Sequence, residues 1–469
     1  MYCWDDYKHE TPQWFRDAKF GLFFHWGPYS VAEFGNEWYS RNIYDKGHEA
    51  RAFHEKTFGS TNAFGYKDLI PEFTGEHFDP EQWAGLVQLA GAKYAGPVTE
   101  HGDNYSLWNS QINPVNSVKT GPCRDVVGEC FDAFRTRGIR CLATFHHQWL
   151  WGWFMGNDME ADVYLPENEL YYGKILPLET GRYIPNMLPD REFCQQWRDK
   201  VLEVLWKYSP DAVYFDSRAN IIPDMYKQQI CEALYQRADT AITYKQFDFP
   251  EGTAVVDIEN GRFAECKPFP WQTDDRLEEL PTWSYVKDPK YKSAERIIHQ
   301  LIDIVAKNGN LLLNVGPKYD GTFHSSAVAV LKEIGDWLRL CGEAIYGTRP
   351  WCVAAEGPTV MRDNNYDIKK INNQIELGYM MESSMESFSA QDIRFTQKDG
   401  AVYAMALGWP SDGRLVVRSL GTGSGLKTVT SVRLLGCGCP VEWVQAADGL
   451  YVRLPETQLY AHACALKVE

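Results

Sequence analysis

The sequence predicts a TIM-like (β/α)8 barrel followed by a β-sandwich. Up to about residue 350, short apolar runs alternate with helix-period segments, which is typical of a parallel sheet covered by helices. Beyond that point helical periodicity disappears, and short alternating runs separated by turns are typical of antiparallel strands. We therefore expect a catalytic barrel domain over residues 1–350 and a sandwich domain over residues 351–469.

The barrel prediction depends on a series of short apolar runs suited to strands that are buried on both faces. In chain order these runs are 20–27, 93–99, 139–145, 212–215, 240–244 and 310–316. Helical periodicity occurs at 81–92, 125–138, 193–208, 225–238, 294–308 and 326–346. The count approaches eight strand–helix units. No Gly-x-Gly-x-x-Gly follows the first strand, which disfavours a dinucleotide-binding sheet.

Two further regions have a distinct pattern of amino acids. Residues 149–189 lack clear periodicity and are rich in Trp, Tyr and acidic side chains, and a loop of that length in a compact domain is usually functional. We expect this loop to form a wall or lid over a site. The sandwich strands are expected at 393–396, 402–407, 415–419, 429–435, 449–454 and 461–468.

Composition narrows the class of partner. A formal net charge of −16 argues against nucleic acid or an anionic membrane surface, because both require clustered Lys and Arg. The 17 Trp favour a carbohydrate partner, since sugar rings stack on indoles, although most of these rings are expected to fill the core. Nothing in the sequence sets the oligomeric state. Without a cleavable leader or a membrane-length span, we expect a cytoplasmic protein, or a secreted or periplasmic one whose signal peptide was removed.

Polar side chains recur where the predicted strands end: His25, His101, His146 and His147, Asp216 and Asn314. In a barrel these ends meet at one mouth, so residues far apart in sequence become neighbours there. We therefore expect most of them to line one pocket. For Asp216 the alternative is a helix N-cap, because Asp is common at strand-to-helix turns.

A pocket of carboxylates, His and Trp without an obvious nucleophilic Ser or Cys suits glycosidic-bond hydrolysis, which needs two carboxyl groups. Asp216 is the candidate for the ionised member. Glu259, directly before an Asn-Gly turn, and Glu265, nearer Trp271, are candidates for the second, with an ion pair to Arg262 as the alternative for either. No paired Cys or His spacing of a metal site is present, so we expect no metal and no cofactor.

Several motifs together resemble glycoside hydrolase family 29, the α-L-fucosidases. They are Lys-Phe-Gly-Leu-Phe-Phe-His-Trp-Gly-Pro-Tyr-Ser at 19–30, Asn-Glu-Trp-Tyr at 36–39, Ala-Lys-Tyr-Ala at 92–95, Val-Tyr-Phe-Asp at 213–216, Lys-Asn-Gly-Asn-Leu-Leu-Leu-Asn-Val-Gly-Pro at 307–317 and Glu-Ala-Ile-Tyr-Gly-Thr-Arg at 343–349. The resemblance covers nearly the whole chain. It implies a TIM-like barrel with a C-terminal β-sandwich, and removal of terminal α-linked L-fucose from an oligosaccharide or glycoconjugate. It also implies retention of configuration through a covalent glycosyl-enzyme intermediate, without a metal.

The resemblance also implies residue roles. Asp216 matches the nucleophile, and Glu259 is favoured over Glu265 as acid/base. Five residues match, or lie near, family positions that bind the sugar hydroxyls: His25, Glu37, Trp38, His101 and His146. Two residues, Phe23 and Trp283, match the family pocket for the C5 methyl group. Trp26, which follows His25, and Trp271 are further aromatic candidates for substrate binding.

One departure from the family bears on the substrate. Members commonly have His-His-Asp-Gly where this chain has His101-Gly102-Asp103-Asn104. Losing a donor to a buried hydroxyl costs about 1–3 kcal/mol. Either a neighbour, His147 or the long loop, replaces the imidazole, or the sugar is a different, galactoside-like one. A catalytically weak carbohydrate-binding relative is the remaining alternative.

Overall fold

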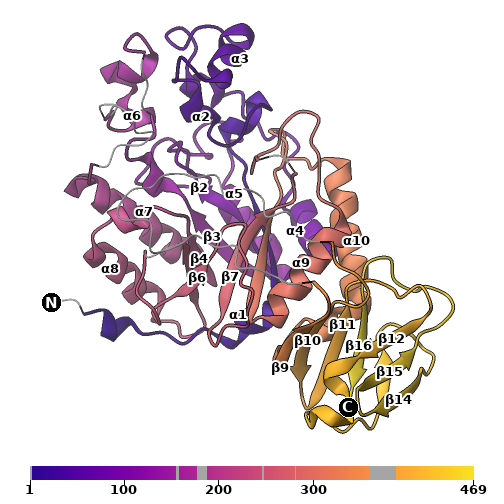
Figure 1. Cartoon of the computed structure of the whole chain (residues 1–469). Coiled ribbons are helices and arrows are strands. Elements are labelled where there is room, and N and C mark those ends of the chain that lie inside the picture. The colour runs from indigo at the N-terminus through magenta and orange to yellow at the C-terminus, as the bar shows by residue number, and fades with distance from the viewer. Residues whose placement is uncertain (1–2, 155–157, 177–186, 246–247, 280, 360–386) are drawn as a thin grey trace.

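The first domain is a closed barrel of eight parallel strands (Figure 1). The computed structural model describes residues 3–154, 158–176, 187–245, 248–279, 281–359 and 387–469. Each barrel strand pairs with the next in the chain, and β8 closes the barrel on β1. The strands are β1 (Phe20–Phe24), β2 (Tyr94–Glu100), β3 (Arg140–Phe145), β4 (Ala212–Phe215), β5 (Ala241–Lys245), β6 (Val255–Asp257), β7 (Trp271–Arg276) and β8 (Gly309–Asn314).

Helices connect and cover most of these strands. They are α1 (Gln13–Ala18), α2 (Tyr39–Asn42), α3 (Glu49–Thr57), α4 (Pro80–Ala90), α5 (Val126–Thr136), α6 (Glu169–Tyr172), α7 (Arg191–Tyr208), α8 (Asp224–Leu234), α9 (Ala294–Ala306) and α10 (Ser325–Cys341). Side-chain oxygens of Asp79, Asp125 and Asp190 cap the N-termini of α4, α5 and α7. In the part of the chain that the structure describes, no helix is both long and apolar enough to cross a membrane.

The strand side chains alternate between the barrel interior and the helix layer, as the pleat requires. In β4, Ala212 and Tyr214 belong to the interior cluster, whereas Val213 and Phe215 pack in the large cluster under the helices. Asp216 is the next residue of the interior series. The same alternation places one polar side chain after another at the top of the interior, where the strands end.

The sequence analysis missed β6 and β7. β6 has only three residues, and β7 reads Trp-Gln-Thr-Asp-Asp-Arg, which is polar although all six residues are buried. Its polar residues are stabilised by partners inside the barrel and in α9 rather than by water. Between β5 and β7 the described residues contain no helix. The predicted fold class is confirmed, but this part of the barrel lacks regular strand–helix alternation.

The second domain consists of two antiparallel sheets (Figure 1). Their strands are β9 (Arg349–Glu356), β10 (Ile393–Lys398), β11 (Ala401–Ala406), β12 (Arg414–Val417), β13 (Val432–Leu434), β14 (Glu442–Ala446), β15 (Gly449–Arg453) and β16 (Cys464–Val468). The sheet orders are β13-β16-β11-β10-β9 and β12-β15-β14, so β9 and β14 are additions to the predicted strands. A buried ion pair, Arg394 Nε to Asp303 Oδ1 at 2.5 Å, joins β10 to α9.

Candidate active site

Most of the polar residues expected at the strand ends do meet at one barrel mouth, and His147 is the exception. Rings of His25, His101 and His146 lie 5.1–5.7 Å apart, although they follow three different strands. Asp216 and Asn314 lie at the ends of β4 and β8, and Asn314 accepts a hydrogen bond from His25 Nδ1 at 2.7 Å. The interpretation of Asp216 as a helix N-cap is wrong, because α8 begins eight residues later and is preceded by Pro223.

The centre of the mouth is the ammonium group of Lys245, the last residue of β5. Its Nζ lies 3.0 Å from Asp216 Oδ1 and 2.8 Å from Glu259 Oε2. The third contact, 3.0 Å to Asp274 Oδ2, comes from inside the barrel. The contact to Glu259 is a hydrogen bond, and those to Asp216 and Asp274 are ion pairs. Burial opposes its charge, but the three carboxylates outweigh burial and hold the pKa of Lys245 well above its usual value.

The indole of Trp149 supplies a second contact to Asp216. Its Nε1 donates to Asp216 Oδ2 at 2.7 Å, so each carboxylate oxygen of Asp216 has one partner, an indole and an ammonium. Trp149 belongs to the long segment that the sequence analysis interpreted as a wall over the site. Part of that segment, residues 155–157 and 177–186, lies outside the described residues. In the described part, Trp149 and Trp153 pack beside Trp38 with ring centroids 5.3 and 4.5 Å away.

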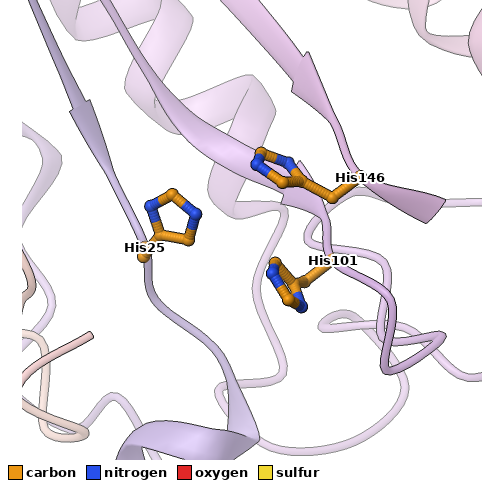
Figure 2. A group of neighbouring side chains, drawn as sticks. All are labelled: His25, His101 and His146. Atoms are coloured by element: carbon orange, nitrogen blue, oxygen red, sulfur yellow. The ribbon is translucent and has the colours of Figure 1, made fainter. Parts of the chain in front are cut away.

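Figure 2 shows His25, His101 and His146 with their rings directed into one common space. Burial lowers the pKa of His25 to about 4 and lowers those of His101 and His146 well below the usual value. All three are therefore neutral near pH 7, each with one N–H donor and one acceptor nitrogen. Neutral rings of this kind suit sugar hydroxyls, which both donate and accept.

The same three rings are a candidate metal cluster, because one nitrogen of each lies within 4.8 Å of the others. Zn–N bonds of 2.0–2.1 Å in a tetrahedral site would bring ligand nitrogens to about 3.4 Å from one another. The rings would have to move together to bind zinc. Hydroxyl groups of a sugar need no such closure, so the arrangement as it stands favours the sugar.

Glu37 and Trp283 form the wall nearest Lys245 and His25. Glu37 Oε2 accepts a hydrogen bond from the backbone N–H of Trp283 at 2.8 Å, and burial raises the pKa of Glu37 to about 7. The Trp283 ring lies 5.5 Å from His25 and 5.9 Å from Phe23, and the Lys245 ammonium lies 5.7 Å from its centroid. Phe23 and Trp283 thus form an aromatic surface beside the polar groups.

The position of Gly102 explains the departure from the family motif. A Cβ at this residue would lie 2.7 Å from the Trp153 ring and 3.0 Å from Trp149 Cβ. The two tryptophans of the long segment therefore fill the space beside Gly102, and Trp153 packs edge-on against His101 at 5.3 Å. His147 does not reach the pocket, because its Nε2 bonds to the Trp197 carbonyl of α7.

Three of the predicted site residues lie elsewhere. Trp26 is buried among Phe73, Phe78 and Trp83 of the outer core, with its Nε1 bonded to the Lys318 carbonyl. Trp271 opens β7 at the amino end of the strand, paired with Gly309, and bonds to the Lys307 carbonyl. Glu265 is exposed on the connection that leads back to that end. Aromatic character alone misplaced the two tryptophans, because helix-facing positions of a strand demand the same residues as a sugar platform.

Sequence reasoning also missed three residues of the site: Lys245, Trp149 and Asp274. Lys245 closes the predicted strand at 240–244 and carried the same signal as His25 and Asp216, a polar residue after an apolar run. Trp149 lay in an aperiodic segment that offered no register. Asp274 lay in the strand that was not recognised.

Two carboxylates held close together at a barrel mouth, between neutral imidazoles and indoles, are suited to the hydrolysis of glycosidic bonds. The fold and the site thus define a glycoside hydrolase with a carbohydrate pocket at the carboxyl ends of its barrel strands.

Comparison with known proteins identifies the family. The Alpha-L-fucosidase family profile matches residues 2–343, and that of the Alpha-L-fucosidase C-terminal domain matches residues 386–469. The chain therefore belongs to the alpha-L-fucosidase family.

Relatives with known names agree with this assignment. Tissue alpha-L-fucosidase of Rattus norvegicus is 29% identical over 468 residues, which cover 95% of this chain and 86% of that protein. Alpha-L-fucosidase of Dictyostelium discoideum is 31% identical over 373 residues, or 75% of each chain. The crystal structure of Thermotoga maritima alpha-fucosidase in complex with fucose superposes with a TM-score of 0.73 at 26% identity, covering 98% of this chain and 97% of that one.

Proposed function

We propose that the protein removes terminal α-L-fucosyl groups with retention of configuration, with Asp216 as nucleophile and Glu259 as general acid/base. The observation that carries the assignment is the shared contact to Lys245. Asp216 Oδ1 and Glu259 Oε2 both contact Lys245 Nζ, at 3.0 and 2.8 Å, so these two oxygens are at most about 5.8 Å apart. Retaining glycosidases have carboxyl groups about 5–5.5 Å apart, whereas inverting ones need about 6.5–9.5 Å to admit a water.

In the first step an Asp216 oxygen attacks the anomeric carbon while the bond from that carbon to the glycosidic oxygen breaks. Glu259, which must be in its protonated form for this step, gives that proton to the departing oxygen, so the aglycone leaves as a neutral alcohol and the sugar is esterified to Asp216. Glu259 is more exposed than Asp216, with 26% of its side-chain surface accessible against 13%, which suits a group that meets the aglycone and later water.

In the second step Glu259, now ionised, takes a proton from water as the water oxygen attacks the anomeric carbon. The bond to Asp216 breaks and its carboxylate is restored, so two inversions give net retention. The Trp149 indole donates to one oxygen of Asp216 and the Lys245 ammonium pairs with the other, and both contacts favour the charged carboxylate that reacts in the first step and is restored in the second.

The substrate assignment follows from the division of the pocket. L-Fucose carries hydroxyls on one side and a methyl group at C5. Neutral histidines with Glu37 suit the hydroxyls, and the aromatic surface of Phe23 and Trp283 suits the methyl group. The Thermotoga maritima relative was crystallised with fucose and with a mechanism-based inhibitor, which supports the same sugar and a reacting nucleophile here.

A panel of nitrophenyl glycosides tests the substrate, and proton NMR of the first-formed product tests the stereochemistry. We expect release from the α-L-fucoside and α-L-fucose as the first anomer. Asp216→Ala should lose at least about 10⁴-fold in kcat. Turnover of a galactoside but not of the fucoside would reject the sugar assignment. A β-anomer formed first, or an Asp216→Ala variant with a normal rate, would reject the mechanism.

A further inference from the structure

One layer below the reacting groups, the barrel interior holds a pair of acids that the mechanism above does not use. Asp257 closes β6 and Asp274 lies in the middle of β7, and both are almost completely buried. The two acids are close enough to act on each other, since Asp257 helps to raise the pKa of Asp274. Gln272 Nε2 donates to Asp257 Oδ2 at 2.7 Å, and the Tyr214 hydroxyl donates to Asp274 Oδ2 at 3.1 Å.

Burial and the mutual repulsion of the two carboxyls favour a single negative charge on the pair. The Oδ1 atom of each acid is buried and has no donor among the described residues, so a proton held between the two carboxyls is what satisfies them. Burial and the facing Asp257 raise the pKa of Asp274 well above its usual value, and burial raises that of Asp257. Two neighbouring buried carboxyls do not both ionise near neutral pH.

The negative charge of the pair acts on the ammonium group of Lys245. Of the two acids, Asp274 contacts the ammonium at 3.0 Å, from the side opposite the open mouth. We propose that the Asp257–Asp274 pair positions Lys245, with Asp274 holding the ammonium from inside the barrel so that it stays between Asp216 and Glu259. The inference rests on the proposed roles of those two carboxylates and adds two positioning residues to them.

Several strands contribute titratable groups that act on the pair. They are Tyr94 of β2, Tyr214 of β4, Lys245 of β5 and Glu259 after β6, and Asp216 after β4 shares Lys245 with Asp274. The tyrosines are held un-ionised by burial. Lys245 is the cation that contacts the pair directly.

Replacing each acid by its isosteric amide distinguishes the role of Asp274 from that of Asp257. In Asp274→Asn one negative charge next to Lys245 is lost, so nearby carboxyls give up their protons more readily. Both limbs of the pH profile of kcat/KM should move to lower pH by about half a unit to one unit, and kcat should fall about tenfold as Lys245 loses its third contact. In Asp257→Asn the remaining Asp274 is free to ionise against Lys245, so the limbs should stay in place and the loss of kcat should be smaller.

Asp275→Asn is the matched control. Asp275 is the next residue of β7, is equally buried and also pairs with a lysine, Lys292 at 2.8 Å, but it faces α9 instead of the interior. Its substitution should lower the melting temperature without moving either limb. A purely structural role for Asp274 would make Asp274→Asn behave in the same way.

The profiles are measured on whichever aryl glycoside the wild-type protein turns over, so a different sugar specificity does not affect the test. Limbs that move in Asp274→Asn but not in Asp257→Asn or Asp275→Asn support the inference. Unmoved limbs with normal kcat in Asp274→Asn, or equal shifts in all three variants, overturn it. If Asp274→Asn does not fold, Tyr214→Phe decides, because it removes only the hydroxyl that donates to Asp274. A smaller shift in the same direction supports the inference, and an unmoved profile overturns it.

Discussion

The Trp149 indole N–H donates to Asp216 Oδ2 at 2.7 Å, which joins the aperiodic segment after β3 to the end of β4. This contact makes the segment part of the reacting site and not only a cover over it. It also gives Asp216, the proposed nucleophile, a hydrogen-bond donor that is independent of Lys245. The contact therefore has a direct kinetic consequence.

Trp149→Phe should lower kcat about 10-fold to 100-fold, because a hydrogen bond to a charged group contributes about 1.5–3 kcal/mol. The bond favours the ionised carboxylate, so its loss should move the acid limb of kcat/KM to higher pH. Steady-state kinetics between pH 4 and 9 measure both effects. Trp151→Phe is a suitable control, since the Trp151 indole bonds to the Met187 carbonyl and not to Asp216. Equal kinetics for the two variants would remove Trp149 from the site.

The acid/base assignment separates two glutamates six residues apart. Glu259→Ala should lose activity most strongly on substrates with poor leaving groups, and azide should restore turnover by attacking the glycosyl-enzyme in place of water. Glu265→Ala should be close to wild type, because Glu265 is exposed on the far connection. Azide rescue of Glu265→Ala instead would transfer the role to that residue.

Much of the fold could be predicted because apolar strands and amphipathic helices follow directly from burial. The predicted runs correspond to β1–β5 and β8. β7 was not recognised because the barrel interior around Lys245 is polar. A strand that carries Gln272 and Asp274 has no apolar periodicity to detect. Local pattern cannot show that these groups satisfy one another across the barrel.

The residues of the candidate site likewise divide into those that the sequence predicted and those that it did not. His25, His101, His146 and Asp216 each end an apolar run, so strand-end logic brought them to one mouth. Trp271 was misplaced because residue type does not tell the two ends of an unrecognised strand apart. The filling of the space at Gly102 depends on the path of an aperiodic loop, which no local rule gives.

Restoring the common family residue at position 102 should not restore a donor. In Gly102→His, a Cβ 2.7 Å from the Trp153 ring forces that indole, and with it Trp149, to move. We expect a melting temperature lower by several degrees and at least about tenfold lower kcat/KM, since overpacking costs about 1–3 kcal/mol. The double variant Gly102→His/Trp153→Ala opens the space and should recover part of both losses. Strict additivity of the two changes would show that the residues do not compete for one space.

Asp248 should make a contribution to the stability of the fold that is lost as pH rises. Burial raises the pKa of Asp248 to about 8, and its Oδ1 has no hydrogen-bond partner among the described residues. The native state keeps this proton and the unfolded state does not, so unfolding releases a proton between about pH 4 and pH 8 and becomes easier as pH rises. Asp248→Asn should flatten the decrease of melting temperature between pH 5 and 8, measured by calorimetry. An unchanged slope would mean that Asp248 is ionised in the native protein.

Specificity for a 6-deoxy sugar should depend on the Trp283 ring. Its backbone N–H bonds to Glu37 and its carbonyl accepts from Asn314 Nδ2 at 2.6 Å, and both contacts survive substitution of the side chain. Trp283→Ala therefore keeps these backbone contacts and removes the ring that lies 5.9 Å from Phe23 and also faces His25 and Lys245.

We expect kcat/KM for the α-L-fucoside to fall about 10-fold to 200-fold, the range for a lost apolar contact in a pocket. The α-L-galactoside differs from the fucoside by one hydroxyl on C6. Its kcat/KM should fall less, because the apolar ring of Trp283 offers that hydroxyl no hydrogen-bond partner. The ratio of the two kcat/KM values should therefore approach one in Trp283→Ala and stay near the wild-type value in Trp283→Phe. A ratio that is unchanged in Trp283→Ala would place the methyl group elsewhere in the pocket, since no other effect of the substitution distinguishes two sugars that differ only at C6.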